Sequence, residues 1–197
     1  MLFGKEEISI LVVSKSGKIF DALGDLLNGR FYTDIKQALS ISEAKRLTLM
    51  QSFDIAVINA PLKDETGIEF AINLSSDNST GVLLLINNEY YDRVLDEVTE
   101  YGVLTVPKPL SKQTLYETVN LIAATNFRLK KLEHTNAKLT AKMEEIRVVN
   151  HAKWVLIENL GLTEEEAHKI IEKQAMDTRQ TKREVAEAVL KTYKTSK

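Results

Sequence analysis

Cysteine is absent from the 197-residue chain, which excludes disulfides and metal sites built on thiolates. The three histidines, His134, His151 and His168, are too far apart in the sequence to indicate a zinc motif. No uncharged apolar run approaches the roughly 20 residues that a membrane span needs, and the N-terminus lacks the basic and apolar regions of a signal peptide. These absences predict a soluble, cytoplasmic protein with no cofactor and no membrane partner. No metal site is expected, although the absences leave a metal held by carboxylates open.

Glycine and proline are scarce, with eight and three residues respectively. Neither occurs between Pro109 and Gly161, so one helix can cover most of that interval. The hydrophobic content of 44% is sufficient for a buried core. The length fits one globular domain followed by a smaller appendage.

Negative charge is concentrated in the first part of the chain. Residues 1–121 contain 11 Lys and Arg against 17 Asp and Glu, whereas residues 122–150 contain six against three and residues 151–197 contain nine against eight. An acidic domain followed by a slightly basic one is weak support for an output region that binds a polyanion.

Short apolar runs rich in β-branched residues alternate with segments of helical periodicity in the first domain. Several runs are apolar without alternation, as in strands that are covered on both faces. The pattern predicts an α/β domain over residues 1–121 with a five-stranded parallel sheet. The predicted strands are 8–13, 31–33, 55–58, 82–86 and 103–106, and the predicted helices are 19–27, 41–50, 67–74 and 91–101.

A seven-residue apolar repeat covers about four heptads of the interval without glycine or proline. Asn136 and Asn150 recur at one seam position, where paired asparagines favour a parallel two-stranded register. Residues 122–150 are therefore predicted to form a coiled-coil linker helix that makes a homodimer; the alternative is an amphipathic helix packed on its own domain. The predicted seam consists of Leu129, Leu132, Asn136, Leu139, Met143, Ile146 and Asn150.

Helix-capping residues divide the end of the chain. Gly161 predicts the end of the long helix, and the pairs Thr163 with Glu166 and Thr181 with Glu184 have the spacing of capping boxes. Residues 147–197 are therefore predicted to form a small three-helix domain. Its apolar residues are few, so dimerisation would help to stabilise it.

The first domain resembles the receiver domain of two-component response regulators, which has a flavodoxin-like fold. The resemblance is carried by Asn59 at the end of the third predicted strand, Gly67 eight residues later, and Lys108 with Pro109 after the fifth. It implies a site at the carboxyl ends of the strands. In a receiver, acidic residues hold Mg²⁺ there, and an aspartate attacks a phosphoryl donor and becomes phosphorylated.

The residues at the matching positions have different chemistry. Ser14 and Lys15 replace the acidic pair, Asn59 replaces the phosphorylated aspartate, and Asn87 replaces a hydroxyl residue, so that only Lys108 is retained. An amide is a poor nucleophile and a weak ligand for Mg²⁺, which predicts a pseudo-receiver that is not phosphorylated by the usual route. Lys15 is expected either to bond the Asn59 amide in place of the metal or to point into water.

Three stretches near the end of the chain, residues 147–157, 161–167 and 175–186, resemble the ANTAR family of RNA-binding antitermination modules. The resemblance implies a dimer that binds paired RNA hairpins in a leader transcript and prevents a terminator from forming. Trp154 departs from the small residue that is usual in the family at this position. We expect Trp154 to stack on a base or, as the favoured alternative, to pack in the core.

RNA hairpins are recognised through their phosphates and through unstacked loop bases, so an interface needs cations near planar groups. Arg179, Lys182 and Arg183 are the strongest candidates because they surround the start of the third helix, whose N-terminal amides also favour phosphate. For each cation the alternative is an ordinary solvated position. The predicted RNA-binding residues are Lys153, Arg179, Lys182, Arg183 and Lys191.

The sequence thus predicts an RNA-binding antitermination regulator with a pseudo-receiver domain. The alternative is a protein-interaction adaptor, in which the receiver fold docks a protein partner and the helical tail binds another protein. The chain has no phosphate-cradling glycine loop and no nucleophile with a paired base, so an enzyme is not expected.

Overall fold

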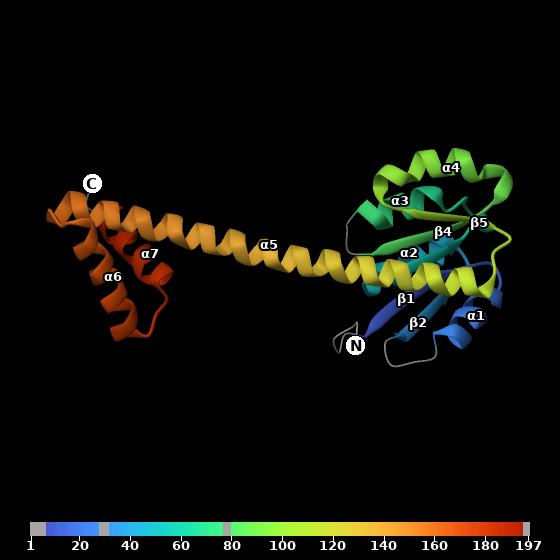
Figure 1. The fold of residues 1–197 in the computed structure, drawn as a ribbon, viewed down its shortest axis with the longest axis horizontal. Coiled ribbons are helices and arrows are strands. Elements are labelled where there is room, and N and C mark those ends of the chain that lie inside the picture. Colours follow the sequence, from blue (N-terminus) through green and yellow to red (C-terminus); the bar gives the residue numbers. More distant parts are fainter. Residues whose placement is uncertain (1–6, 28–31, 77–79, 195–197) are drawn as a thin grey trace. The chain divides into compact units, whose positions relative to one another are not determined.

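A computed structural model of the chain describes residues 7–27, 32–76 and 80–194. The chain divides into two compact units, Met1–Lys131 and Leu132–Lys197. Figure 1 shows a sheet flanked by helices, a long helix α5, and two further helices. The predicted order of a parallel α/β domain, a long helix and C-terminal helices is confirmed.

The first unit is a five-stranded parallel sheet in the order β2-β1-β3-β4-β5. Strand β2 is longer than predicted because its polar residues hide the strand pattern, and polar side chains are tolerated in an edge strand. Phe31, placed in this strand by the sequence, lies outside the described residues. The elements are β1 (Ile8–Val13), α1 (Lys18–Leu26), β2 (Tyr32–Ala38), α2 (Ile41–Met50), β3 (Ile55–Asn59), α3 (Ile68–Ser76), β4 (Gly81–Asn87), η1 (Asn88–Tyr90), α4 (Tyr91–Val98), η2 (Thr99–Tyr101), β5 (Leu104–Lys108) and the start of α5 (Lys112–Leu160).

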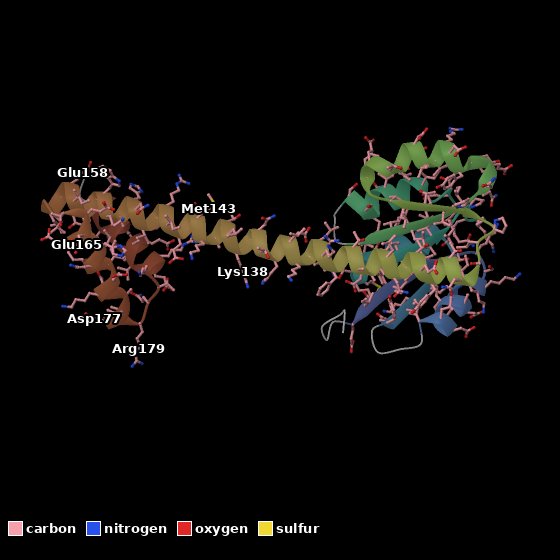
Figure 2. The ribbon with its side chains drawn as sticks, in the orientation of Figure 1. Lys138, Met143, Glu158, Glu165, Asp177 and Arg179 are labelled. Atoms are coloured by element: carbon pink, nitrogen blue, oxygen red, sulfur yellow. The ribbon has the colours of Figure 1, made fainter. Side chains whose placement is uncertain are left out.

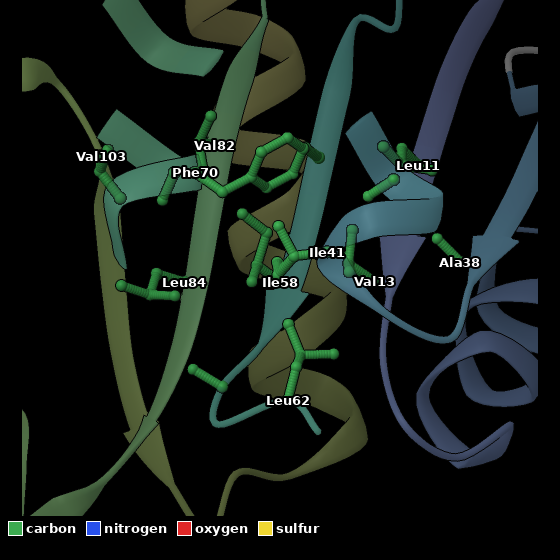
Figure 3. Packing of buried hydrophobic residues seen from close by; sticks show 14 of the residues in the cluster. Leu11, Val13, Ala38, Ile41, Ile58, Leu62, Phe70, Val82, Leu84 and Val103 are labelled. Atoms are coloured by element: carbon green, nitrogen blue, oxygen red, sulfur yellow. The ribbon is translucent and has the colours of Figure 1, made fainter. Parts of the chain in front are cut away.

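Helices cover both faces of the sheet, and alternate residues of each strand point to opposite faces. Leu11 and Val13 of β1 pack with residues of α2, α3 and α4, as Figure 3 shows for part of this cluster. Ile10 and Val12 pack instead with α1 and with the first turns of α5. The sheet is therefore buried on both faces, as its continuous apolar strands predict.

Helix α5 lies very close to the sheet at Gly81, the first residue of β4. A Cβ atom at Gly81 would lie 2.3 Å from Cγ2 of Ile122 and 2.6 Å from Nδ2 of Asn126. Real Cβ atoms do not make contacts this short, so the absence of a side chain at position 81 permits the helix to pack here. A side chain at this position would have to displace the helix or the strand.

Polar contacts through Asp54 hold the same part of α5 at the amino end of β3. Asn126 donates a hydrogen bond to the backbone oxygen of Asp54 (2.7 Å), and Lys130 forms an ion pair with its carboxylate. The carboxylate also accepts bonds from the backbone N–H (2.8 Å) and the hydroxyl (2.9 Å) of Ser9. Burial raises the pKa of Asp54, but the bonds from Lys130 and Ser9 outweigh burial and keep it below its ordinary value.

The second unit consists of the C-terminal part of α5, α6 (Glu164–Thr178) and α7 (Lys182–Lys194). Gly161 follows α5 with φ 66°, and the capping boxes Thr163 with Glu166 and Thr181 with Glu184 are both formed. These predicted helix boundaries are confirmed. The core is small and rich in alanine, and it contains Val149, Ala152, Leu156, Ala167, Ile171, Ala175, Val185 and Ala186.

No helix among the described residues combines the length and the apolar character needed to cross a bilayer. Helix α5 has the length, but charged residues occur along most of it.

Asp64 lies in the loop after β3 and caps the start of α2. Its carboxylate accepts hydrogen bonds from the backbone N–H groups of Ile41 (3.1 Å) and Ser42 (3.0 Å) and from the Ser42 hydroxyl (3.1 Å). These bonds, led by that from the Ser42 N–H, favour the charged form and lower the pKa of Asp64 to about 2. Asp64 is therefore a structural residue and not merely a solvated surface charge.

The close approach at Gly81 can be tested by adding a methyl group. Gly81→Ala is expected to lower the free energy of unfolding by about 1–3 kcal/mol, because the new Cβ overlaps Ile122 and Asn126. Gly24→Ala is the matched control, since Gly24 lies inside α1 and a Cβ there meets no atom within 4 Å. Gly24→Ala should raise the free energy of unfolding by about 0.5–1 kcal/mol. Urea unfolding of both variants measures the difference, and equal stabilities would contradict the packing.

The Asp64 cap predicts a pH-dependent contribution to stability. Because the folded-state pKa of about 2 lies below the ordinary 3.8, the contribution is complete above about pH 4 and is lost as the pH falls towards 2. The difference in urea midpoint between the wild type and Asp64→Asn should therefore be largest near neutral pH and should shrink on acidification. Asp25→Asn removes an exposed carboxylate of α1 and should change the midpoint less at neutral pH. A difference for Asp64→Asn that does not vary with pH would exclude the charged cap.

Candidate functional site

The carboxyl ends of β1, β3 and β5 bring three predicted pocket residues together. The Asn59 side-chain nitrogen donates a hydrogen bond to the hydroxyl of Ser14 (3.2 Å). The Lys108 ammonium donates to the amide oxygen of Asn59 (3.0 Å) and to the backbone oxygen of Ala60. Ser14 is fully buried. The hydrogen bonds among these three side chains therefore lie on the inner side of this edge of the sheet. Asn87, half-buried at the end of β4, pairs in register with Lys108.

Lys15 does not make the bond to Asn59 that one of our two interpretations assigned to it. Its side chain is exposed, and the amide oxygen of Asn59 is bonded by Lys108 instead. Ser14, the residue before it, is fully buried, so the chain turns the Ser14 side chain inward and leaves Lys15 at the surface. Burial lowers the pKa of Lys108, and the nearby charge of Lys15 lowers it further.

The residues at this edge of the sheet do not fit a divalent cation. Ser14, Asn59 and Asn87 offer neutral oxygens, whereas Lys15 and Lys108 bring two positive charges. Magnesium is ordinarily held by at least one carboxylate. Within the described parts of the chain, no group of three or more His, Cys, Asp or Glu residues is arranged to hold a metal ion.

Three of the five predicted RNA-binding cations are paired with glutamates of the second unit. The Lys153 side chain is only 13% exposed, and its ammonium lies 3.0 Å from a Glu164 carboxylate oxygen. Lys182 pairs with Glu172, and Nε of Arg183 lies 2.8 Å from an oxygen of Glu187. The Lys182–Glu172 and Arg183–Glu187 pairs are exposed and therefore weak, so a phosphate can replace the carboxylate in each. Lys153, which is mostly buried, is much less accessible to a ligand.

Arg179 differs from the other cations in its backbone and in its surroundings. It ends α6 in the left-handed conformation, with φ 54°. Its side chain has no hydrogen bond or ion pair to any residue that the structure describes, and Figure 2 shows it extending away from the tip of α6. Arg179 therefore offers its full charge to a ligand. The remaining candidate, Lys191, is exposed on α7.

A groove of about 300 Å³ lies beside Arg179, where α6 ends and α7 begins. Met176 forms one wall and is 74% exposed. Gln180 and Lys182 also line the groove, together with Glu172 and Ala175. Met176 and Gln180 are not among the predicted RNA-binding residues. An apolar residue near a helix end is ordinarily interpreted as core, and Gln180 carries no charge.

Trp154 lies on the surface of α5 and is 65% exposed. The favoured expectation that it packs in the core is therefore wrong. Ala152 and Leu156, two positions before and after it, are buried against α6 and α7. Since residues two apart on a helix lie about 200° apart, Trp154 points to the opposite side.

The apolar residues of the predicted dimer seam are exposed in the single chain. The exposed fractions are 60% for Leu132, 56% for Leu139, 72% for Met143 and 52% for Ile146. Leu129, in the first unit, is 44% exposed, and Asn136 and Asn150 are exposed as well. Within one chain, the described residues therefore leave these side chains exposed. The coiled coil stays a prediction.

Residues 137–190 match the model of the ANTAR domain family. The match includes the end of α5, all of α6 and most of α7. The chain is also 27% identical over 189 residues to the transcriptional regulatory protein PdtaR of Mycobacterium tuberculosis, covering 95% of this chain and 92% of that protein.

Solved structures similar to this chain share the fold of its first unit. The signal receiver domain of an HD domain-containing protein from Pseudomonas fluorescens is 18% identical with a TM-score of 0.56, covering 66% of this chain and 95% of that domain. The chemotaxis response regulator CheY4 of Vibrio cholerae is 21% identical with a TM-score of 0.51, covering 59% and 98%. The chain therefore joins a domain of the receiver fold to a C-terminal ANTAR domain.

Proposed function

We propose that this protein is an RNA-binding regulator of transcription antitermination whose receiver-like domain is not phosphorylated. The observation that carries the proposal is the ANTAR match over residues 137–190, which coincides with a folded three-helix unit. The similarity to PdtaR, named a transcriptional regulatory protein, extends over 95% of the chain and supports a regulatory role for both units together.

The RNA contact is proposed at the junction of α6 and α7. Arg179 supplies an uncompensated charge for a backbone phosphate, and the adjacent groove offers Met176 and the Gln180 amide to an unstacked loop base. Lys182 and Arg183 exchange their glutamate partners for phosphates, and Lys191 adds charge on α7. Lys153 has a different role, because its bond to Glu164 fastens α5 to the start of α6.

A homodimer is proposed to form through the exposed seam of α5. A second chain would cover Leu132, Leu139, Met143 and Ile146, which the single chain leaves in water. In this arrangement residues 1–121 are the input domain, residues 122–150 are the dimerising linker and residues 147–197 are the output. A dimer presents two ANTAR units, as a transcript with paired hairpins requires.

The receiver-like domain is proposed to respond to something other than phosphoryl transfer. Asn59 is held by Ser14 and Lys108 in a network that has neither an aspartate to accept a phosphoryl group nor a carboxylate for Mg²⁺. Because these side chains are bonded to one another, we propose that a protein partner controls the domain by binding this edge of the sheet.

RNA binding can be tested by filter binding with a transcript that contains two adjacent hairpins from a leader region. The logarithm of affinity should fall linearly with the logarithm of salt concentration, because phosphate contacts release counterions. Arg179→Ala should weaken binding and reduce the steepness of this dependence by about one. Lys169→Ala, which removes an exposed lysine of α6 paired with Glu165 at 2.7 Å, is the control and should have little effect. Failure to bind any paired-hairpin RNA would overturn the proposal and favour the protein-interaction adaptor.

The loss of phosphorylation can be tested by incubating the protein with acetyl phosphate and Mg²⁺. Its intact mass should not change, whereas a receiver with an acceptor aspartate, treated in parallel, should gain a phosphoryl group. Mg²⁺ should also leave the thermal unfolding midpoint unchanged, because a ligand stabilises only a protein that binds it. A phosphoryl group mapped to the edge that contains Asn59 would contradict this part of the proposal.

A further inference from the structure

Trp154 has an unusual position for a large apolar residue. It is the only tryptophan in the chain and is 65% exposed on α5. The opposite face of the helix, with Val149, Ala152 and Leu156, is buried against α6 and α7. Figure 2 shows Met143 and Glu158 on the side of α5 away from these two helices. The indole therefore contributes nothing to the core of its own unit.

The exposed apolar residues of the second unit continue along α5 to Trp154. Leu132, Met143 and Trp154 are spaced eleven residues apart and are 60%, 72% and 65% exposed. Eleven residues make slightly more than three full turns, so each residue is displaced from the previous one by only about 20° around the helix. Asn150 lies one turn before Trp154 on the same face. Trp154 is thus the last large apolar residue of the stripe that begins at Leu132.

The seven-residue repeat alone does not reach Trp154. After Asn150, that repeat would place Lys153 on the seam, but the Lys153 side chain is mostly buried beside Glu164. An eleven-residue spacing instead keeps the stripe almost straight along the helix. The spacing of the exposed apolar residues thus changes from seven to eleven in the part of α5 that also packs against α6 and α7.

Charges beside the stripe balance between two parallel copies of the chain. In the seven-residue register, Arg128 of one copy approaches Glu133 of the other, which is attractive, and Lys142 approaches Arg147, which is repulsive. Glu144 lies 3.6 Å from Arg147 of its own chain and offsets part of that repulsion. The paired asparagines of the seam, and not the flanking charges, favour the parallel arrangement.

The surroundings of Trp154 are poorly suited to RNA. Of the neighbouring cations, Lys153 is mostly buried and paired with Glu164, and Arg147 lies two turns away beside Glu144. The carboxylate of Glu158 follows Trp154 one turn later. The accessible cation Arg179 is on α6, which packs on the opposite face of α5.

Resting on the proposed homodimer, we infer that Trp154 packs against a second copy of this chain. The contact between two parallel α5 helices then extends beyond the seven-residue seam into the ANTAR domain. Trp154 loses its exposure to water when the dimer forms, and the two output units are joined directly.

Because the chain has one tryptophan, its fluorescence reports on this contact without any substitution. Sedimentation equilibrium of the full-length protein gives the fraction of dimer over a dilution series, and tryptophan emission is recorded on the same samples. The emission maximum should shift to shorter wavelength in parallel with the fraction of dimer, and acrylamide should quench the dimer less than the monomer.

Trp154→Ala should raise the dimer dissociation constant at least about tenfold, as expected for a buried tryptophan in an interface. Ile170→Ala, which truncates a 40% exposed apolar residue of α6, is the matched control and should leave the constant unchanged. Circular dichroism should show that both variants keep their helices, since neither side chain belongs to the buried core.

Each other outcome overturns the inference in a distinguishable way. A dimer that forms without an emission shift would leave the proposed dimer standing and remove Trp154 from its interface. A protein that stays monomeric at all concentrations would overturn both. Emission that is insensitive to concentration but quenched by hairpin RNA would assign Trp154 to the RNA contact. RNA affinity, measured separately by filter binding, tests the output function independently.

Discussion

Helix α5 has to complete two separate hydrophobic cores with two parts of one continuous helix. Its first turns bury Leu115, Val119 and Ile122 against the sheet, and its last turns bury Val149, Ala152 and Leu156 against α6 and α7. The residues between these parts belong to neither core. Their apolar side chains remain exposed in one chain, and burial in a second chain would lower their free energy. The exposed seam is therefore a consequence of how α5 divides its contacts.

The sheet edge follows a different constraint, which is charge. In the sequence the missing acidic residues are the obvious feature, but in the structure the retained lysine defines the arrangement. The Lys108 ammonium is bonded to the Asn59 amide and the Ala60 carbonyl, so a positive group of the protein itself satisfies those oxygens. The site is closed by its own side chains, and two lysines near it oppose the binding of another cation.

Much of the fold could be predicted from the sequence because its signals are local. Apolar runs gave the strands, and the caps at Gly161, Thr163 and Thr181 gave the helix boundaries. Strand β2 was underestimated because its polar residues at a sheet edge lack the apolar pattern. The predicted pocket residues Ser14, Asn59 and Lys108 do meet, because the ends of parallel strands lie along one edge of the sheet.

The details that depend on side-chain direction could not be predicted in the same way. Whether Lys15 or Lys108 bonds Asn59 depends on which of Ser14 and Lys15, the two residues that follow β1, points inward. Trp154 looked like a core residue because its size suggested burial, yet its place on the helix faces away from α6 and α7. The pairing of Lys153 with Glu164 joins residues from two helices, and no local pattern in the sequence indicates which cations are neutralised.

Arg179 combines a conformational cost in folding with the role in RNA binding that we propose for it. Glycine is the residue most easily accommodated in the left-handed conformation that ends α6, and an arginine there carries a conformational penalty. The same backbone turn directs the guanidinium into solvent, where it finds no partner among the described residues. A selection for stability alone would tend to replace Arg179 with glycine and so remove a cation that has no partner among the described residues. If Arg179 binds RNA as proposed, engineering a more stable protein and keeping an active one are opposing aims at this position.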